Sequence, residues 1–161
     1  MRWWSRLIST RKADVFIPPT MPTHEQIRDA EDKLGITFPS TYLAFLRKRD
    51  PVPLGLCAKF YWIGAESPDC ENIVEANGRL RKEGIPAYLV AFFNDGMGNL
   101  VCFDSRKTTA NGESPIFFWD HELPAEANIE ATERDAENRE SCGIVAKAFS
   151  KWLESELASH R

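Results

Sequence analysis

Two short segments of the chain contain residue types that could perform chemistry. Asp120-His121-Glu122 places a base between two acids, an arrangement that can transfer protons or bind a metal ion. Asn94-Asp-Gly-Met-Gly-Asn99 gathers side-chain oxygens and glycines, as a cation-binding loop would. Both segments follow apolar runs, which is also typical of strand ends and turns.

A structural role explains both segments better. Adjacent residues of a strand point to opposite faces, so His121 would not share a face with its two acidic neighbours. In the glycine-containing segment, no further acid stands in the register that calcium requires. We expect Gly96 and Gly98 to adopt positive φ angles. Asn94 and Asp95 would then bond the backbone of a hairpin turn.

The cysteines show neither a zinc pattern nor an activated nucleophile. None belongs to a C-x-x-C pair, so we predict no metal site and no cofactor. Cys102 lies within an apolar strand, where a thiol packs as a small hydrophobic group. The chain also lacks the G-x-S-x-G motif of serine hydrolases. We therefore predict no catalytic residue and a protein that is not an enzyme. The four cysteines are Cys57, Cys70, Cys102 and Cys142.

Length and composition indicate a globular protein. With 161 residues and 43% hydrophobic content, the chain fits a single domain. A domain of this size buries roughly 70% of its unfolded surface, so it needs no disulfide or metal for stability. No apolar run approaches the ~18 residues of a transmembrane helix. Residues 1–8 also lack the apolar stretch of a secretory leader, so we expect a cytoplasmic protein with reduced thiols.

Charge is distributed unevenly along the chain. Residues 1–13 contain four bases and no acid, whereas the rest of the chain contains 16 bases and 24 acids. An acidic body argues against direct nucleic-acid binding and is compatible with a basic protein partner. We interpret residues 1–20 as a basic N-terminal extension and 21–158 as a single domain. Trp3 and Trp4 of the extension could dock on that domain or on a membrane surface.

The segments that must position these residues alternate between helical and strand patterns. Thr23 and Gln26 have the spacing of a capping box, which predicts a helix that ends at Gly35. A second helix is expected from Ser40, as its cap, to Arg49. A third opens at Ser67-Pro68 and ends by Gly84, and a fourth covers about 141–158. Strands are predicted over 60–63, 88–93, 100–104 and 116–119.

This order predicts an α+β fold. A central, mainly antiparallel sheet would pack against helices from the N- and C-terminal parts of the chain. Because the strands are apolar at successive positions, both faces of the sheet should be covered.

Residues 122–140 are strongly polar and form either a long surface loop or a partly helical, solvated segment. Its acids could occupy the basic cleft of a partner, since charge complementarity speeds association and selects the partner. The alternative is that these acids bind no partner and only keep a surface loop solvated. The candidate partner-binding residues are Glu126, Glu130, Glu133, Asp135 and Glu137.

An ordered set of motifs resembles the SUKH superfamily, of the Smi/Knr type. Its opening helices match Glu31-x-x-Leu-Gly-Ile-x-Phe-Pro39 and Tyr42-x-x-Phe-Leu46. Its central hairpin, later strand and closing helix match the segments 92–104, 115–122 and 149–153. The second helix of the family commonly leads into an Asn-Gly-Gly turn, where this chain has Arg49-Asp-Pro-Val-Pro53.

The resemblance implies an α+β fold and a function in binding. Bacterial members are mostly immunity proteins, which block a cognate polymorphic toxin, such as a nuclease or deaminase, without chemistry. We therefore expect a toxin-neutralising protein whose partner is a basic toxin domain. The alternative is a regulatory or scaffold module that binds proteins without any toxin partner.

Overall fold

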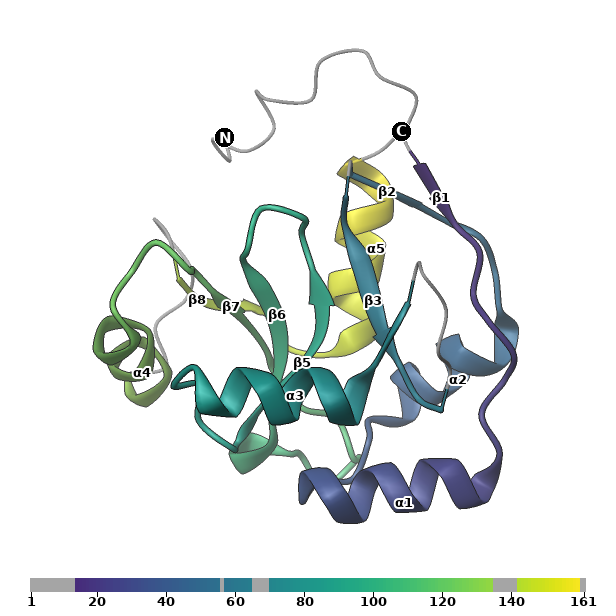
Figure 1. Ribbon diagram of the computed structural model, residues 1–161, viewed down its shortest axis with the longest axis horizontal. Coiled ribbons are helices and arrows are strands. Elements are labelled where there is room, and N and C mark those ends of the chain that lie inside the picture. The colour runs from purple at the N-terminus through teal and green to yellow at the C-terminus, as the bar shows by residue number, and fades with distance from the viewer. Residues whose placement is uncertain (1–13, 56, 65–69, 135–141, 160–161) are drawn as a thin grey trace.

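The computed structural model describes residues 14–55, 57–64, 70–134 and 142–159. Its fold is α+β, as predicted. A six-stranded sheet has the order β4-β3-β5-β6-β7-β8, and a separate two-stranded sheet pairs β1 with β2 (Figure 1). In the large sheet, only the pair of β3 and β4 is parallel. None of the described helices is long and apolar enough to cross a membrane.

The strands are β1 (Asp14–Phe16), β2 (Val52–Leu54), β3 (Lys59–Trp62), β4 (Glu71–Asn72), β5 (Leu89–Asn94), β6 (Leu100–Asp104), β7 (Ile116–Trp119) and β8 (Gly143–Ala146). The helices are α1 (His24–Leu34), α2 (Ser40–Lys48), α3 (Ile73–Lys82), α4 (Ala125–Glu133) and α5 (Phe149–Ser159).

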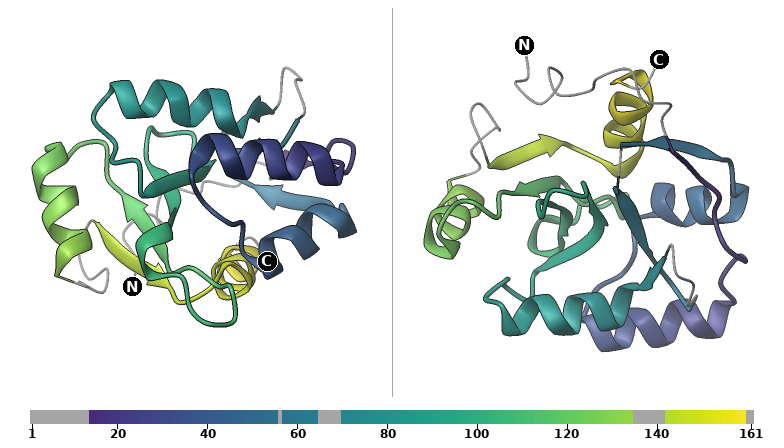
Figure 2. Two further views of the ribbon diagram at one scale, coloured as in Figure 1. Left: turned by 90° about the horizontal axis from the view of Figure 1, so that it is seen from below. Right: turned by 45° about the horizontal axis from the view of Figure 1, so that its top comes forward.

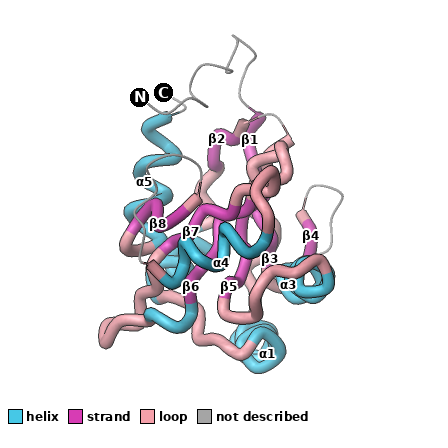
Figure 3. The backbone as a smooth tube through the Cα atoms, turned by 90° about the vertical axis from the view of Figure 1, so that its left-hand side faces the viewer, coloured by secondary structure: helices cyan, strands magenta, loops and turns pink. Residues whose placement is uncertain are grey.

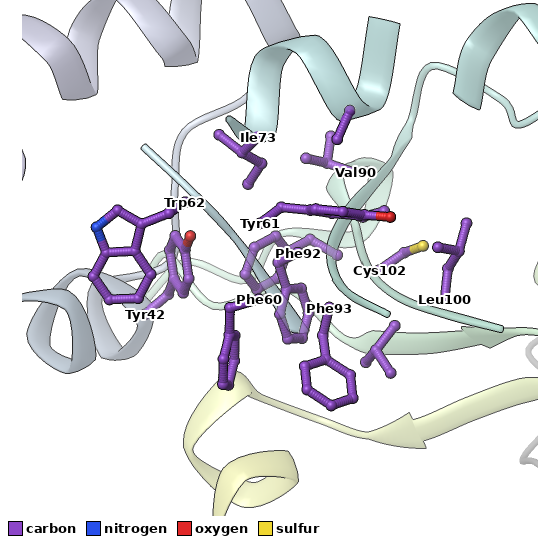
Figure 4. Packing of buried hydrophobic residues seen from close by; sticks show 14 of the residues in the cluster. Tyr42, Phe60, Tyr61, Trp62, Ile73, Val90, Phe92, Phe93, Leu100 and Cys102 are labelled. Carbon is purple, nitrogen blue, oxygen red and sulfur yellow. The ribbon is translucent and has the colours of Figure 1, made fainter. Parts of the chain in front are cut away.

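Helices cover both faces of the sheet, as the apolar strands predicted. α1 and α3 lie side by side on one face, which the left view of Figure 2 shows. On the other face, Tyr42 of α2 and Phe149 of α5 are 5.2 Å apart between ring centroids. Figure 4 shows Phe60 and Phe93 directed toward α5, whereas Ile73 lies on the side of α3.

The predicted capping box of α1 is confirmed. The backbone N–H of Gln26 donates to Thr23 Oγ1 at 3.1 Å, and Gln26 Oε1 accepts from the N–H of Thr23 at 2.8 Å. Gly35 ends the helix with a φ of 73°, in the left-handed region where glycine carries no steric cost.

The predicted cap of α2 was wrong. Pro39 occupies the N-cap position, and Ser40 is the first helical residue. The carboxylate of Glu113, from the distant loop before β7, accepts from the Ser40 hydroxyl at 2.9 Å and from the N–H of Thr41 at 3.1 Å. An acid at a helix N-terminus satisfies free N–H groups and complements the helix dipole. A residue 72 positions away in sequence therefore caps this helix.

The predicted start of the terminal helix was also wrong. α5 begins at Phe149, and residues 143–146 form β8, which pairs antiparallel with β7. Ile144 and Val145, which fall within the range expected for the helix, lie in this strand. β-branched residues favour strands when a partner strand is available. Phe149 and Trp152 of α5 are buried.

The third helix begins later than expected. α3 starts at Ile73, where the side chain of Asn72 accepts from the N–H of Val74 at 2.9 Å and serves as the cap. The predicted opening at Ser67-Pro68 lies outside the described residues.

Part of the predicted N-terminal extension packs on the domain. Phe16 of β1 is buried against Phe60 and Trp62. Trp3 and Trp4 lie outside the described residues, and the division at residue 21 stays a prediction.

Replacing Tyr42 by phenylalanine is expected to leave the free energy of unfolding unchanged or to raise it by up to about 1 kcal/mol. The Tyr42 hydroxyl is fully buried and has no hydrogen-bond partner among the described residues. Burial, with a smaller effect of Cys70, raises the pKa of this hydroxyl above its usual value. Urea denaturation measures the effect. The control is Tyr88→Phe, which removes a bond to Thr132. A clear loss of unfolding free energy for Tyr42→Phe would show that the Tyr42 hydroxyl has a hydrogen-bond partner after all.

Candidate protein-binding surface

Part of the acidic segment predicted to bind a partner, residues 125–133, forms α4. Pro124 precedes the helix, and Glu126 lies in its first turn, where a negative charge complements the helix dipole. Figure 3, viewed from the side of α4, shows this helix in front of β6 and β7. The prediction of a partly helical segment was therefore correct for residues 125–133, but this helix is not solvated on all sides.

Two fully buried polar residues, Asn128 and Thr132, attach α4 to the domain. They are four positions apart and therefore lie on the same face of the helix. Such a face shows no hydrophobic periodicity, so a search for apolar stripes misses it. The two polar residues, together with Pro124 before the helix, are the signal that could have located it.

Asn128 fastens the first half of α4 to the end of β7. Its Oδ1 accepts from the N–H of Asp120 at 3.0 Å, and its Nδ2 donates to the carbonyl of Asp120 at 2.9 Å. This reciprocal pair occupies both backbone groups of a buried residue. The amide therefore positions α4 relative to the sheet in the way that a neighbouring strand residue would.

Thr132 fastens the second half of the helix. Its hydroxyl lies 3.1 Å from the hydroxyl of Tyr88, and its carbonyl accepts from Lys107 Nζ at 2.9 Å. Because both contacts come from the connections that flank β5 and β6, the two ends of α4 are held by different parts of the sheet.

The outer face of α4 presents the predicted acids. Glu126, Glu130 and Glu133 are all exposed, at spacings of four and three residues that place them along one side of the helix. Glu130 pairs with Arg134, an exposed i, i+4 contact of small energetic value. We call Glu126, Glu130 and Glu133 the acidic face. Asp135 and Glu137 lie outside the described residues.

One cation lies beside this acidic face but is already neutralised. The guanidinium of Arg106 bonds the buried carboxylate of Asp104 and lies 3.6 Å from the centre of the Tyr88 ring. The bond to Asp104 raises the pKa of Arg106 above its usual value, with smaller contributions that include Glu133. Arg106 therefore does not neutralise the acids of α4, of which Glu130 forms the exposed pair with Arg134.

The predicted role of the hairpin turn is confirmed. Gly96 and Gly98 have φ angles of 83° and 102°. Asn94 Oδ1 accepts from the N–H of Gly96 at 2.7 Å, and Asp95 Oδ1 accepts from the N–H of Met97 at 2.8 Å. These oxygens therefore hold the turn. Among the described residues, no group of three or more His, Cys, Asp or Glu side chains could hold a metal ion.

His121 packs against this turn. Its Nδ1 lies 2.8 Å from Asn99 Oδ1, which also accepts from the backbone N–H of His121 at 3.1 Å. A Cβ atom at Gly98 would lie 2.9 Å from the His121 ring, so glycine is required there. The histidine thus bonds an amide, which cannot exchange a proton with it in the way that a catalytic acid or base does.

Two of the four cysteines, Cys70 and Cys102, are buried, whereas Cys57 is exposed and Cys142 is half-buried. Cys102 is fully buried in β6, as predicted, and burial raises the pKa of its thiol above the usual range. All four cysteines are free.

Comparison with known protein families places the chain. The model of the SMI1/KNR4 family (SUKH-1) matches residues 21–155, most of the chain. This span includes every element described from α1 to β8 and most of α5. No curated protein matches the chain.

Proposed function

Since this chain belongs to the SMI1/KNR4 family (SUKH-1), we propose that it is a non-catalytic immunity protein that binds and neutralises a cognate polymorphic toxin. The family is associated with immunity domains that act by binding proteins. The toxin is a nuclease or deaminase domain with a basic surface. The chain works as a competitor for that surface and transforms no substrate.

The position of the acidic face carries this proposal. Glu126, Glu130 and Glu133 lie on the outside of a helix whose inner side is bonded at both ends to the sheet. A surface held in place before binding loses little conformational entropy when the partner arrives. Asp135 and Glu137 are two further acids in the sequence that directly follows α4.

The lack of catalysis is supported by the surroundings of the candidate chemical groups. His121 bonds the amide of Asn99, and the oxygens of Asn94 and Asp95 accept from backbone N–H groups. A stable complex with the toxin would bury about 1,600 Å² of accessible surface, and an interface of this size needs apolar contacts beside the acids. The acids would then set the association rate and the choice of partner.

Reversing the charge of the acidic face is expected to slow association with the toxin about 10- to 100-fold at low salt. The variant combines Glu126→Lys, Glu130→Lys and Glu133→Lys. The toxin domain encoded beside this chain in its genome is the partner, and stopped-flow or surface-based kinetics at several salt concentrations measure the rate. Coexpression with the same toxin domain tests whether growth is restored.

A control separates position from net charge. Glu25→Lys, Asp32→Lys and Glu75→Lys change the charge by the same amount at exposed sites on α1 and α3. This control should associate at nearly the wild-type rate. Equal association rates for both triple variants would show that the acidic face has no specific part in binding the toxin. Failure of the wild-type chain to restore growth would contradict toxin neutralisation itself.

A further inference from the structure

The outer edge of β1 carries backbone groups that have no partner among the described residues. β1 and β2 form a sheet of two strands, and β1 runs along the right-hand edge of the molecule in Figure 1. Within the described part of the chain, no hydrogen bond involves the N–H or the carbonyl of Val15 or Ile17. These groups are therefore free to pair with another strand.

The register of the two strands explains why these groups point outward. Val15 lies opposite Pro53, which has no N–H, so this pair is not hydrogen-bonded and the backbone of Val15 faces away from β2. Ile17 stands two positions further along, and the proline that follows it favours an extended backbone. Val15 and Ile17 therefore present two N–H groups and two carbonyls on one edge.

The side chains of the same two residues are apolar and exposed. Val15 and Ile17 are 57% and 74% exposed, whereas Phe16 between them is buried. Edge strands normally carry a charge or a proline that prevents pairing. β2 follows this rule, because Pro53 occupies its outer edge. The edge of β1 has no such block from Val15 to Ile17, which indicates an interaction surface.

This free edge is short and complementary to itself. The next outward position is Pro19, which lacks an N–H and whose carbonyl already accepts from Arg49 Nε at 2.9 Å. When two copies align antiparallel about Phe16, Val15 of each copy lies opposite Ile17 of the other. Two residues paired in this way exchange both of their N–H···O bonds. Every free group on the edge then has a partner, and two pairs of β-branched side chains form.

We propose that this edge is a subunit interface, at which β1 pairs antiparallel with β1 of a second copy of this chain. The two small sheets join into one of four strands, in the order β2-β1-β1-β2. A two-fold axis passes between the two copies of Phe16, so the contact closes after two subunits. Val15 to Ile17 contains no charge, and Asp14 lies opposite Pro18 of the second copy, which separates the two Asp14 residues.

The dimer is weak and does not compete with toxin binding. Two short strands bury less than the roughly 1,200 Å² of a standard interface, so we expect a dissociation constant on the order of 100 µM. α4 lies at the left of Figure 1, on the opposite side of the molecule from β1. The acidic face therefore stays accessible in the dimer.

Analytical ultracentrifugation of the full chain, from about 10 µM to about 1 mM, measures this pairing. We expect the sedimentation coefficient to rise with concentration toward that of a dimer. Val15→Pro should weaken dimerisation at least about 10-fold, because it removes an N–H that points away from β2 and leaves the bonds between β1 and β2 in place. Val15→Thr is the matched control, since it retains both the N–H and the β-branch, and should dimerise like the wild type.

Paired charges test the antiparallel register. Val15→Lys alone and Ile17→Glu alone should each weaken dimerisation about 5-fold or more, because a charge then faces an apolar side chain. A chain with both changes places each new lysine opposite a new glutamate of the second copy. That double variant should dimerise more tightly than either single variant, and added salt should weaken it.

Three results would overturn the proposal. The wild-type chain could remain monomeric at the highest concentration, Val15→Pro could dimerise as well as Val15→Thr, or the double charge variant could be no better than the single ones. If circular dichroism shows that Val15→Pro fails to fold, the charge variants decide the matter. Val15→Pro should neutralise the toxin as well as the wild type does, so failure of the pairing is distinct from failure of the proposed function.

Discussion

Replacing Asn77 by alanine is expected to lower the free energy of unfolding by about 3 kcal/mol, because two buried backbone groups lose their partner. Asn77 lies on α3 and is 1% exposed. Its Oδ1 accepts from the N–H of Ala91, and its Nδ2 donates to the carbonyl of Ala91, both at 2.8 Å. These are the two bonds that a residue of a neighbouring strand would make.

The strand that should make these bonds is displaced. β3 pairs with β5 only at Phe93 and Asn94, and the register of β5 against β6 shifts between Ala91 and Phe93. This irregularity lets both Phe92 and Phe93 contact Trp152 of α5, at 5.0 and 5.2 Å between ring centroids. Asn77 compensates for the missing strand bonds. The irregularity in β5, the attachment of α3 and the aromatic packing against α5 therefore all depend on the side-chain amide of Asn77.

Urea denaturation followed by circular dichroism measures this effect. Gly78→Ala is the control, because Gly78 is the next residue of α3 and a Cβ there meets nothing within 4 Å. That change should raise the free energy of unfolding by about 0.5–1 kcal/mol. A loss below about 1 kcal/mol for Asn77→Ala would mean that other groups satisfy Ala91 once the amide is gone.

Asn128→Ala is expected to release α4 while the sheet stays folded, with a loss of about 2–3 kcal/mol. The change leaves the N–H of Asp120 without its partner and removes the shorter of the two hydrogen bonds that the carbonyl of Asp120 accepts, the other coming from the N–H of Leu123 at 3.3 Å. Amide hydrogen exchange should accelerate in residues 125–133, whereas β5 and β6 keep their protection. Glu126→Gln, which alters an exposed acid of the same helix, should leave the exchange of α4 nearly unchanged.

The same variant distinguishes positioning from charge in toxin binding. Asn128→Ala retains every acid of α4, so the salt dependence of the association rate should persist. The complex should dissociate faster, because the helix must be ordered on binding. Charge reversal of the acidic face should instead act mainly on association. Unchanged dissociation together with accelerated exchange in α4 would show that the helix lies outside the interface.

Local chemistry made much of the fold predictable. The capping box at Thr23, the glycine at the end of α1 and the Asn-Asp-Gly turn between β5 and β6 all depend on residues within a few positions of one another. The apolar runs of β5, β6 and β7 were recognised for the same reason. The acids of α4 could likewise be named from sequence, because exposed charge requires no partner.

Predictions failed where a distant partner decides the structure. Residues 143–146 form a strand because β7 offers an edge to pair with, and α2 is capped by Glu113 rather than by its own first residue. Nothing near Asn77 or Asn128 in sequence indicates that their amides replace strand contacts. A buried amide is informative only when the backbone groups that it satisfies are known.

The sequence by itself determined the strands β3, β5, β6 and β7, the ends of α1, the hairpin turn and the family, because these follow from side chains that act on their own neighbourhood. Tertiary structure alone decided how α4 is attached, how β5 is completed at Ala91, and that Val15, Ile17 and Met21 face outward. Each of these depends on groups far apart along the chain, whose hydrogen bonds and burial exist only after folding has brought them together.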